Sequence, residues 1–162
     1  MDSERPERIA ATRRVAAPAG HIFRLITDPA VHVRIDGSGM LVEAGTGVVL
    51  RAVGDAFEME MDREPIGDLP LGRYRVRNTV TRIEPDALLE WSVAANGRSP
   101  WGHVWGYALA PVGEGETDVT SYCDWSQISP ALRERIPRWP IVPKMALITT
   151  LEKLDALATR PS

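Results

Sequence analysis

The sequence of 162 residues is poor in the residues that form covalent or metal cross-links. Cys123 is its single cysteine, so no disulfide can form within the chain and a small disulfide-stapled scaffold is excluded. The three histidines, His21, His32 and His103, stand apart without the spacing of metal ligands. We therefore expect no metal and no other cofactor.

The sequence also has no large excess of positive or negative charge and no long apolar stretch. The formal net charge is −3, which offers no strong field for nucleic acid or an anionic membrane. No apolar stretch approaches the about 20 residues that span a bilayer, and the charged segment 1–8 lacks the apolar core of a signal peptide. We expect a cytoplasmic protein, a monomer or a homodimer, that binds no nucleic acid and is not integral to a membrane.

The sequence lacks the motifs of nucleotide binding and of serine hydrolases. Glycines in the stretches 36–40 and 44–47 are not followed by a predicted helix, so they indicate turns rather than phosphate-binding loops. A Gly-x-Ser-x-Gly elbow is absent. Cys123 has Trp105 as its predicted cross-strand neighbour, and an indole cannot activate a thiol. We expect Cys123 to be a buried, inert thiol.

Tryptophan is the aromatic residue that the chain has in excess, with five Trp against three Tyr and two Phe. An indole is large and its N–H needs a partner, so many indoles in a small domain often line a site. With 44% hydrophobic and 25% charged residues, the composition is that of an ordinary globular chain, and the length suits one domain.

Hydrophobic periodicity predicts an α+β domain. A strand over 9–15, a helix between Pro18 and Pro29, and one helical turn over 32–35 come first. Antiparallel strands follow at 40–44, 48–53, 56–62, 73–84, 88–95, 102–110 and 116–126. After a segment punctuated by prolines, apolar residues recur at helical spacing: Ile148, Leu151, Leu154 and Ala158. One sheet curling around one amphipathic C-terminal helix would leave a crevice between them.

Two predicted hairpins decide which side chains share the concave face of the sheet. Turns at 84–87 and 112–115 place Val80 opposite Trp91, Asn78 opposite Val93, Tyr107 opposite Ser121 and Trp105 opposite Cys123. The predicted ligand-binding residues are apolar, aromatic or thioether side chains with a few polar groups, as small-molecule pockets require: Phe57, Met59, Met61, Asn78, Val80, Trp91, Val93, Trp105, Ser121, Cys123, Trp125, Met145 and Ile148. The alternative is a closed core of the same residues without a cavity.

Charged residues alternate on the opposite face of the same strands. Arg73, Arg75 and Arg77 point outward from one strand, and Glu58 and Glu60 from another. A basic groove for phosphates is one interpretation. Cross-strand ion pairs are the favoured one, because acids of matching period are available.

His103 and Tyr107 are the candidate catalytic residues. An imidazole has an ordinary pKa near 6.5, which suits a general acid or base. Tyr107 lies on the same strand face, about 13 Å further along by the strand rise. The two side chains can therefore contact opposite ends of one ligand but cannot form a direct dyad.

Short motifs in a fixed order extend over residues 9–158. They are Ala17-Pro18-Ala19, Ile35-Asp36-Gly37-Ser38-Gly39, Gly54-Asp55-x-Phe57-x-Met59, Ile83-Glu84-Pro85 before Leu89-x-Trp91, Trp105-x-Tyr107-x-Leu109-x-Pro111 and Tyr122-x-Asp124-Trp125-Ser126. In this order they resemble actinobacterial proteins of the SRPBCC superfamily, the START/polyketide cyclase-like proteins with a birch-pollen-allergen-type fold. The chain departs from many relatives in carrying His32 and Val33 where those have Trp.

The resemblance implies a helix-grip fold, with a curved antiparallel sheet of about seven strands around a long C-terminal helix and two short helices after the first strand. It also implies one ligand-binding domain over 1–162, with 1–8 flexible, and a deep cavity for hydrophobic ligands. Members of the superfamily include lipid carriers, hormone receptors and polyketide aromatases or cyclases, so the fold leaves activity open. No catalytic set of such a member maps residue by residue onto this sequence.

Three hypotheses follow for function. The leading one is a binder of a hydrophobic small molecule that is aromatic, polyketide-like or a lipid. The alternative is a polyketide cyclase or aromatase-type enzyme that uses the same cavity, with His103 and Tyr107 in catalytic roles. The third is a regulatory or stress-response interaction module, in which the segment Arg138-Trp139-Pro140 is exposed to a partner. That segment can equally form a cap over the mouth of the cavity.

Overall fold

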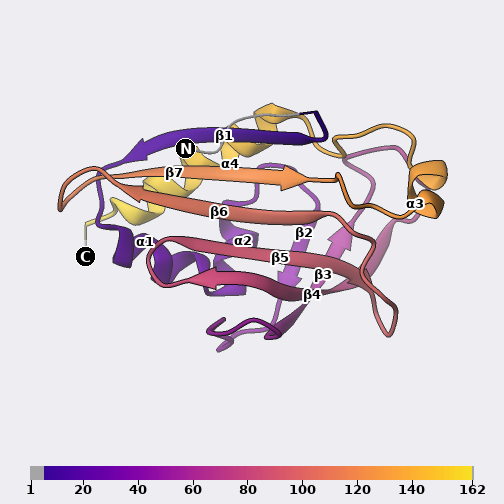
Figure 1. Cartoon of the computed structure of the whole chain (residues 1–162), viewed down its shortest axis with the longest axis horizontal. Coiled ribbons are helices and arrows are strands. Elements are labelled where there is room, and N and C mark those ends of the chain that lie inside the picture. The colour runs from indigo at the N-terminus through magenta and orange to yellow at the C-terminus, as the bar shows by residue number, and fades with distance from the viewer. Residues whose placement is uncertain (1–5, 162) are drawn as a thin grey trace.

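A computed structural model describes residues 6–161 and shows a seven-stranded sheet curled around the C-terminal helix (Figure 1). The elements in chain order are β1 (Arg8–Val15), α1 (Ala19–Ile26), α2 (Pro29–Ile35), β2 (Leu41–Ala44), β3 (Ala56–Asp62), β4 (Arg73–Glu84), β5 (Leu88–Ala95), β6 (Val104–Pro111), β7 (Thr117–Asp124), α3 (Pro130–Arg135) and α4 (Lys144–Ala158). The strand order is β1-β7-β6-β5-β4-β3-β2, and every neighbouring pair is antiparallel. The predicted α+β helix-grip fold is confirmed.

Prolines mark the starts of the helices in the described part of the chain. Asp28 caps α2 by accepting a hydrogen bond from the Ala30 N–H at 3.0 Å, with Pro29 in the first turn. Ser129 caps α3 in the same way through the Leu132 N–H at 3.1 Å. The sequence prediction treated the prolines after residue 129 only as breaks in a helix. It therefore missed α3, where a Ser-Pro pair instead starts one.

The predicted hairpin registers are confirmed. Val80 pairs with Trp91 and Asn78 with Val93 across β4 and β5. Across β6 and β7, Tyr107 pairs with Ser121 and Trp105 with Cys123. Because the register is right, the predicted division of side chains between the two faces of these strands is right as well.

The predicted strand over 48–53 is wrong. The Leu50 N–H donates to the Thr27 carbonyl at the end of α1 (2.9 Å) rather than to a strand, and the Leu50 side chain is buried in the core. Val49 and Val53 are exposed. A loop that contacts a helix end through one buried residue has an apolar pattern like that of a short strand. Periodicity alone therefore cannot distinguish such a loop from a strand.

Strand β1 begins at Arg8, within the segment 1–8 that the sequence analysis expected to be flexible. The Arg8 guanidinium lies over the ring of Tyr122, 3.9 Å from its centroid, and Arg8 is buried. The expectation is wrong for Arg8. Residues 1–5 lie outside the described residues.

The main core lies between the concave face of the sheet and α4. Leu151, Leu154 and Ala158 of the predicted helical stripe are buried there, and Ile148 is half-buried. Gly37 lets the loop after α2 approach α4 closely, because its N–H donates to Thr150 Oγ1 at 2.9 Å and a Cβ at this position would overlap the α4 backbone. Among the described helices, none is long and apolar enough to cross a membrane.

Ion pairs cover the convex face of β3 and β4, as favoured from the sequence. Arg75 lies 3.5 Å from Glu58, and Arg73 lies 3.7 Å from Asp62. These arginines are each about 60% exposed, so the pairs contribute little to stability. Arg73 and Arg75 are thus matched by neighbouring acids, which favours the ion-pair interpretation over a phosphate groove.

Candidate functional site

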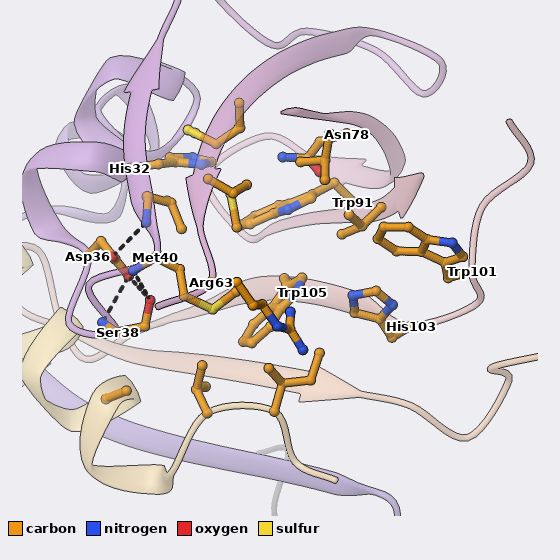
Figure 2. Close-up of a pocket in the computed structure, with 18 of the residues that line it drawn as sticks. His32, Asp36, Ser38, Met40, Arg63, Asn78, Trp91, Trp101, His103 and Trp105 are labelled. Atoms are coloured by element: carbon orange, nitrogen blue, oxygen red, sulfur yellow. Dashed lines mark hydrogen bonds between the residues drawn. The ribbon is translucent and has the colours of Figure 1, made fainter. Parts of the chain in front are cut away.

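A cavity of about 160 Å³ lies between the concave face of the sheet and α4 (Figure 2). It extends from α2, which contributes His32, to α3 and the loop that follows it, which contribute Ile136 and Trp139. We call these the α2 end and the α3 end of the cavity. Its walls are mostly apolar or aromatic, with a few polar groups, which is the composition of small-molecule sites.

Most of the predicted site residues line this cavity. They are Met59, Met61, Asn78, Trp91, Val93, His103, Trp105, Tyr107 and Ser121. The remaining predicted residues do not line it: Phe57, Val80, Cys123, Trp125, Met145 and Ile148. Phe57 and Val80 are buried in the main core, whereas Cys123 and Trp125 belong to a smaller apolar cluster with Ile128, Leu132 and Ile136.

Met145 is the clearest correction among the predicted site residues. Its side chain is 63% exposed, whereas the next residue, Ala146, is buried and lines the cavity. Helix α4 begins directly after Pro143, and in its first turn it turns Ala146 and Leu147 toward the sheet. Successive positions of a helix differ by about 100° in direction, so an error of one residue in phase moves a side chain out of the site.

Several cavity residues come from helices and loops that the strand pattern could not place. They are His32, Asp36, Ser38, Met40, Arg63, Trp101, Arg135 and Trp139. From the sequence, His32 stood out only as an isolated histidine and as a departure from the resemblance, and Trp139 only as part of a proline-rich segment. An isolated polar residue in an otherwise apolar stretch, such as His32, was the signal available.

At the α2 end, His32 completes the cavity wall. Its ring stacks on Trp91, with centroids 4.9 Å apart, and meets Phe57 edge-on at 5.5 Å. Its Nε2–H donates to the Ile26 carbonyl at 2.7 Å. Burial lowers the pKa of His32, so the ring is neutral at neutral pH. His32 is thus a hydrogen-bonded wall residue, held between α1 and the sheet.

Asp36 also lies at the α2 end, and its carboxylate is occupied by the loop after α2. It accepts hydrogen bonds from the Ser38 N–H and hydroxyl at 3.0 and 2.7 Å (Figure 2). It also accepts from the Gly39 N–H at 2.9 Å and from the Leu41 N–H at 3.2 Å. These bonds shape the turn that leads into β2. The carboxylate therefore holds this turn in place rather than binding a ligand.

At the α3 end, three indoles surround His103. Trp101 stacks on its ring at 6.1 Å, Trp105 meets it edge-on at 6.4 Å, and Trp139 meets it edge-on at 5.3 Å. Burial lowers the pKa of His103 to about 4, and the positive charge of Arg63 contributes to the shift. His103 is therefore a neutral imidazole at neutral pH.

Arg63 brings a buried cation to the same part of the cavity, and Asp68 neutralises it. The two side chains form a pair of hydrogen bonds at 2.5 and 2.6 Å, and Arg63 also donates to the Tyr74 hydroxyl at 3.3 Å. The guanidinium lowers the pKa of Asp68. A two-point pair of this kind fixes the orientation of the guanidinium plane.

Three polar atoms around the cavity are buried without a hydrogen-bond partner among residues 6–161. They are Asn78 Oδ1, His103 Nδ1 and Trp139 Nε1, and all three residues line the cavity. Buried polar groups in folded proteins almost always have partners, so these three atoms are exceptions.

The candidate catalytic residues are poorly placed for acid–base chemistry. His103 and Tyr107 are four positions apart on the β6 side of the cavity, and burial raises the pKa of Tyr107. Burial likewise raises the pKa of the Cys123 thiol, which lies outside the cavity lining. Of the described residues that line the cavity, only Asp36 is a carboxylate.

Comparison with known proteins links the chain to proteins without assigned function and to a plant synthase. No family model matches the sequence. It is 33% identical over 121 residues to the uncharacterized protein Rv0088 of Mycobacterium tuberculosis, a match that covers 74% of this chain and 48% of that protein. The chain thus spans about half the length of the curated relatives it matches.

Solved structures share the whole architecture at low sequence identity. Protein CV1439 of Chromobacterium violaceum superimposes with a TM-score of 0.65 at 18% identity, over 97% of this chain and 100% of that one. Truncated norcoclaurine synthase of Thalictrum flavum superimposes with a TM-score of 0.61 at 16% identity, over 96% and 94%. The chain therefore has the helix-grip fold of these structures, which is the fold that the SRPBCC resemblance implied.

Proposed function

We propose that this protein, as an actinobacterial-type member of the SRPBCC superfamily, binds a hydrophobic small molecule in the cavity between the sheet and α4. The observation that carries the proposal is an apolar, indole-lined cavity with a few polar residues in its lining, which is the composition of small-molecule sites. Trp91, Trp101 and Trp105 provide flat apolar surface.

The size of the cavity supports the same conclusion. A cavity of about 150 Å³ is known to admit benzene, so this one, at about 160 Å³, has room for at least one substituted ring.

The enzymatic alternative shares the cavity and has weaker support. The fold accommodates a synthase, as the norcoclaurine synthase structures show for that protein. Here, however, His103 has a pKa of about 4, so it is a weak base at neutral pH, and the Asp36 carboxylate is engaged in four hydrogen bonds with its own loop. Turnover of a poly-β-ketone that is lost in His103→Ala and Tyr107→Phe, with binding intact, would favour the enzyme.

The interaction-module alternative loses its exposed aromatic residue. Trp139 lines the cavity, and its ring stacks on Trp125 at 6.0 Å. The segment around Trp139 is therefore better described as a cap over the α3 end than as a free docking motif. Ligand binding should increase the hydrogen-exchange protection of residues 136–142 if the segment acts as a cap.

A cavity-filling variant tests the proposed function. Ala146→Phe places a benzyl group in the cavity and should abolish the binding of acetophenone measured by calorimetry. Met145→Phe is the matched control, because it adds the same ring one position away on an exposed part of α4. Overpacking costs about 1–3 kcal/mol, so circular dichroism must show that both variants fold. Equal binding by the two variants would contradict a site in this cavity.

A further inference from the structure

The cavity reaches the surface of the protein between the loop 63–72 and α3. Of the described residues that line the cavity, two are exposed, Leu71 in this loop and Arg135 at the end of α3. The loop lies against α3, because Leu69 packs on the apolar cluster that includes Leu132. We call the opening beside Leu71 and Arg135 the mouth of the cavity.

Arg135 brings a positive charge to this mouth. It follows Leu132 by three residues, so the two share the face of α3 that lines the cavity. The Arg135 side chain makes no ion pair and no hydrogen bond with any of residues 6–161. Arg133, by contrast, lies 2.7 Å from the Glu7 carboxylate. The Arg135 guanidinium is therefore open to an anion.

The acidic side chains near the cavity do not offset this charge. Among the described residues that line the cavity, Asp36 is the only carboxylate. It lies at the α2 end, where its own loop holds it in four hydrogen bonds. Glu64 and Asp68, the acids of the loop 63–72, do not line the cavity, and Asp68 is paired with Arg63.

A second cation, Arg63, makes the α3 end of the cavity positive as well. Figure 2 shows its side chain extending into the cavity. Although Asp68 pairs with Arg63, the guanidinium charge still contributes to the low pKa of His103. The field inside the α3 end therefore disfavours a cation and favours an anion.

An apolar cavity with an unpaired cation at its mouth suits an amphiphilic anion. The apolar part of such a molecule gains free energy by leaving water for the cavity. Its charged part stays at the mouth, in contact with water, and so avoids the cost of burying a charge. One unpaired guanidinium matches the single charge and two oxygens of a carboxylate better than the nearly two charges of a phosphate monoester.

We propose that the ligand is a hydrophobic carboxylic acid bound as its anion, with its apolar body in the cavity and its carboxylate beside Arg135 at the mouth. A volume of about 160 Å³ limits the buried body to about one substituted ring. This inference rests on the proposed function and names the charge and the orientation of the ligand in the same cavity.

Three probes with the same phenyl body test the charge of the ligand at pH 7.5. They are 3-phenylpropanoate, which is an anion, 3-phenylpropanamide, which is neutral, and 3-phenylpropylamine, which is a cation. Calorimetry measures their affinities for the natural sequence, for Arg135→Gln and for Arg138→Gln. Arg138→Gln is the matched control, because Arg138 is also exposed but does not line the cavity.

The natural sequence should bind the carboxylate most tightly and the amine most weakly. In Arg135→Gln the ratio of carboxylate to amide affinity should fall about three- to fivefold, as expected for the loss of one ion pair in contact with water. In Arg138→Gln the ratio should stay the same, because both variants lose one surface charge but only one loses the contact. Thermal unfolding of both variants confirms that the fold is intact.

The contrary results separate the inference from the proposed function. Equal binding of the carboxylate and the amide, or a ratio that falls equally in both variants or in neither, would overturn the inferred ligand and leave the proposed function standing. Failure of all three probes to bind the natural sequence, or binding that persists in Ala146→Phe, would overturn both.

Discussion

Acid should destabilise this domain through His103. The imidazole is 4% exposed, and its pKa is about 4 in the folded protein against an ordinary value of 6.5. Between these values the unfolded chain binds a proton at His103 that the folded chain does not bind. The free energy of unfolding therefore falls as the pH falls from 6.5 to 4, and above pH 6.5 His103 contributes no pH dependence.

The size of this loss of stability follows from the difference between the pKa of His103 in the folded protein and its ordinary value. The difference between 6.5 and 4 is 2.5 pH units, and each unit corresponds to about 1.4 kcal/mol, so His103 should remove about 3 kcal/mol of stability over this window. That amount is a large part of the stability of a typical domain. It is large because the imidazole is enclosed by Trp101, Trp105 and Trp139, which cannot solvate a positive charge as water does.

Urea unfolding at pH 7.5, 6.0, 5.0 and 4.5 measures the effect, with His103→Phe as the comparison. The loss of stability on acidification should be smaller in the variant by most of the 3 kcal/mol. His32, whose pKa is also lowered, is present in both proteins, so its contribution cancels. Parallel pH dependences in the two proteins would refute the reasoning.

Three further predictions concern the scaffold. Gly37→Ala should lower the free energy of unfolding by about 1–3 kcal/mol in urea, because its Cβ overlaps the α4 backbone, whereas Gly45→Ala, whose Cβ would meet only Val48 Cγ2 at an ordinary contact of 3.9 Å, should change it little. Tyr122→Phe should cost about 1–3 kcal/mol by the same measurement, because it removes the 2.8 Å hydrogen bond to the buried Glu90; a neutral effect would mean that water replaces the hydroxyl. Cys123 should resist a thiol reagent in the folded protein and react fully in urea, because burial raises its pKa; rapid reaction of the folded protein would contradict its burial.

The sheet could be predicted from the sequence because its register depends on local turns. Turns after Glu84 and Pro111 fix which residues face each other, and alternation then assigns every side chain to a face. For this reason Asn78, Trp91, Trp105 and the other strand residues of the cavity could be named in advance.

The other site residues come from loops and short helices. The periodicity of the sequence does not determine where such segments place their side chains. Arg63 and Trp139 reach the cavity from loops, and His32 reaches it from a helix of seven residues. Met145 was assigned to the cavity from apolar spacing alone, although the phase of α4 is set by its packing against the sheet and by Gly37. The same limit explains the false strand over 48–53, where one backbone hydrogen bond from Leu50 decides the conformation.

The most direct test of a ligand-binding cavity is a crystal structure of the protein purified from its native host. We predict continuous electron density of a flat, mostly apolar molecule beside Trp105, in the cavity between the sheet and α4. A cavity closed by its own side chains, with no bound molecule, would contradict the account.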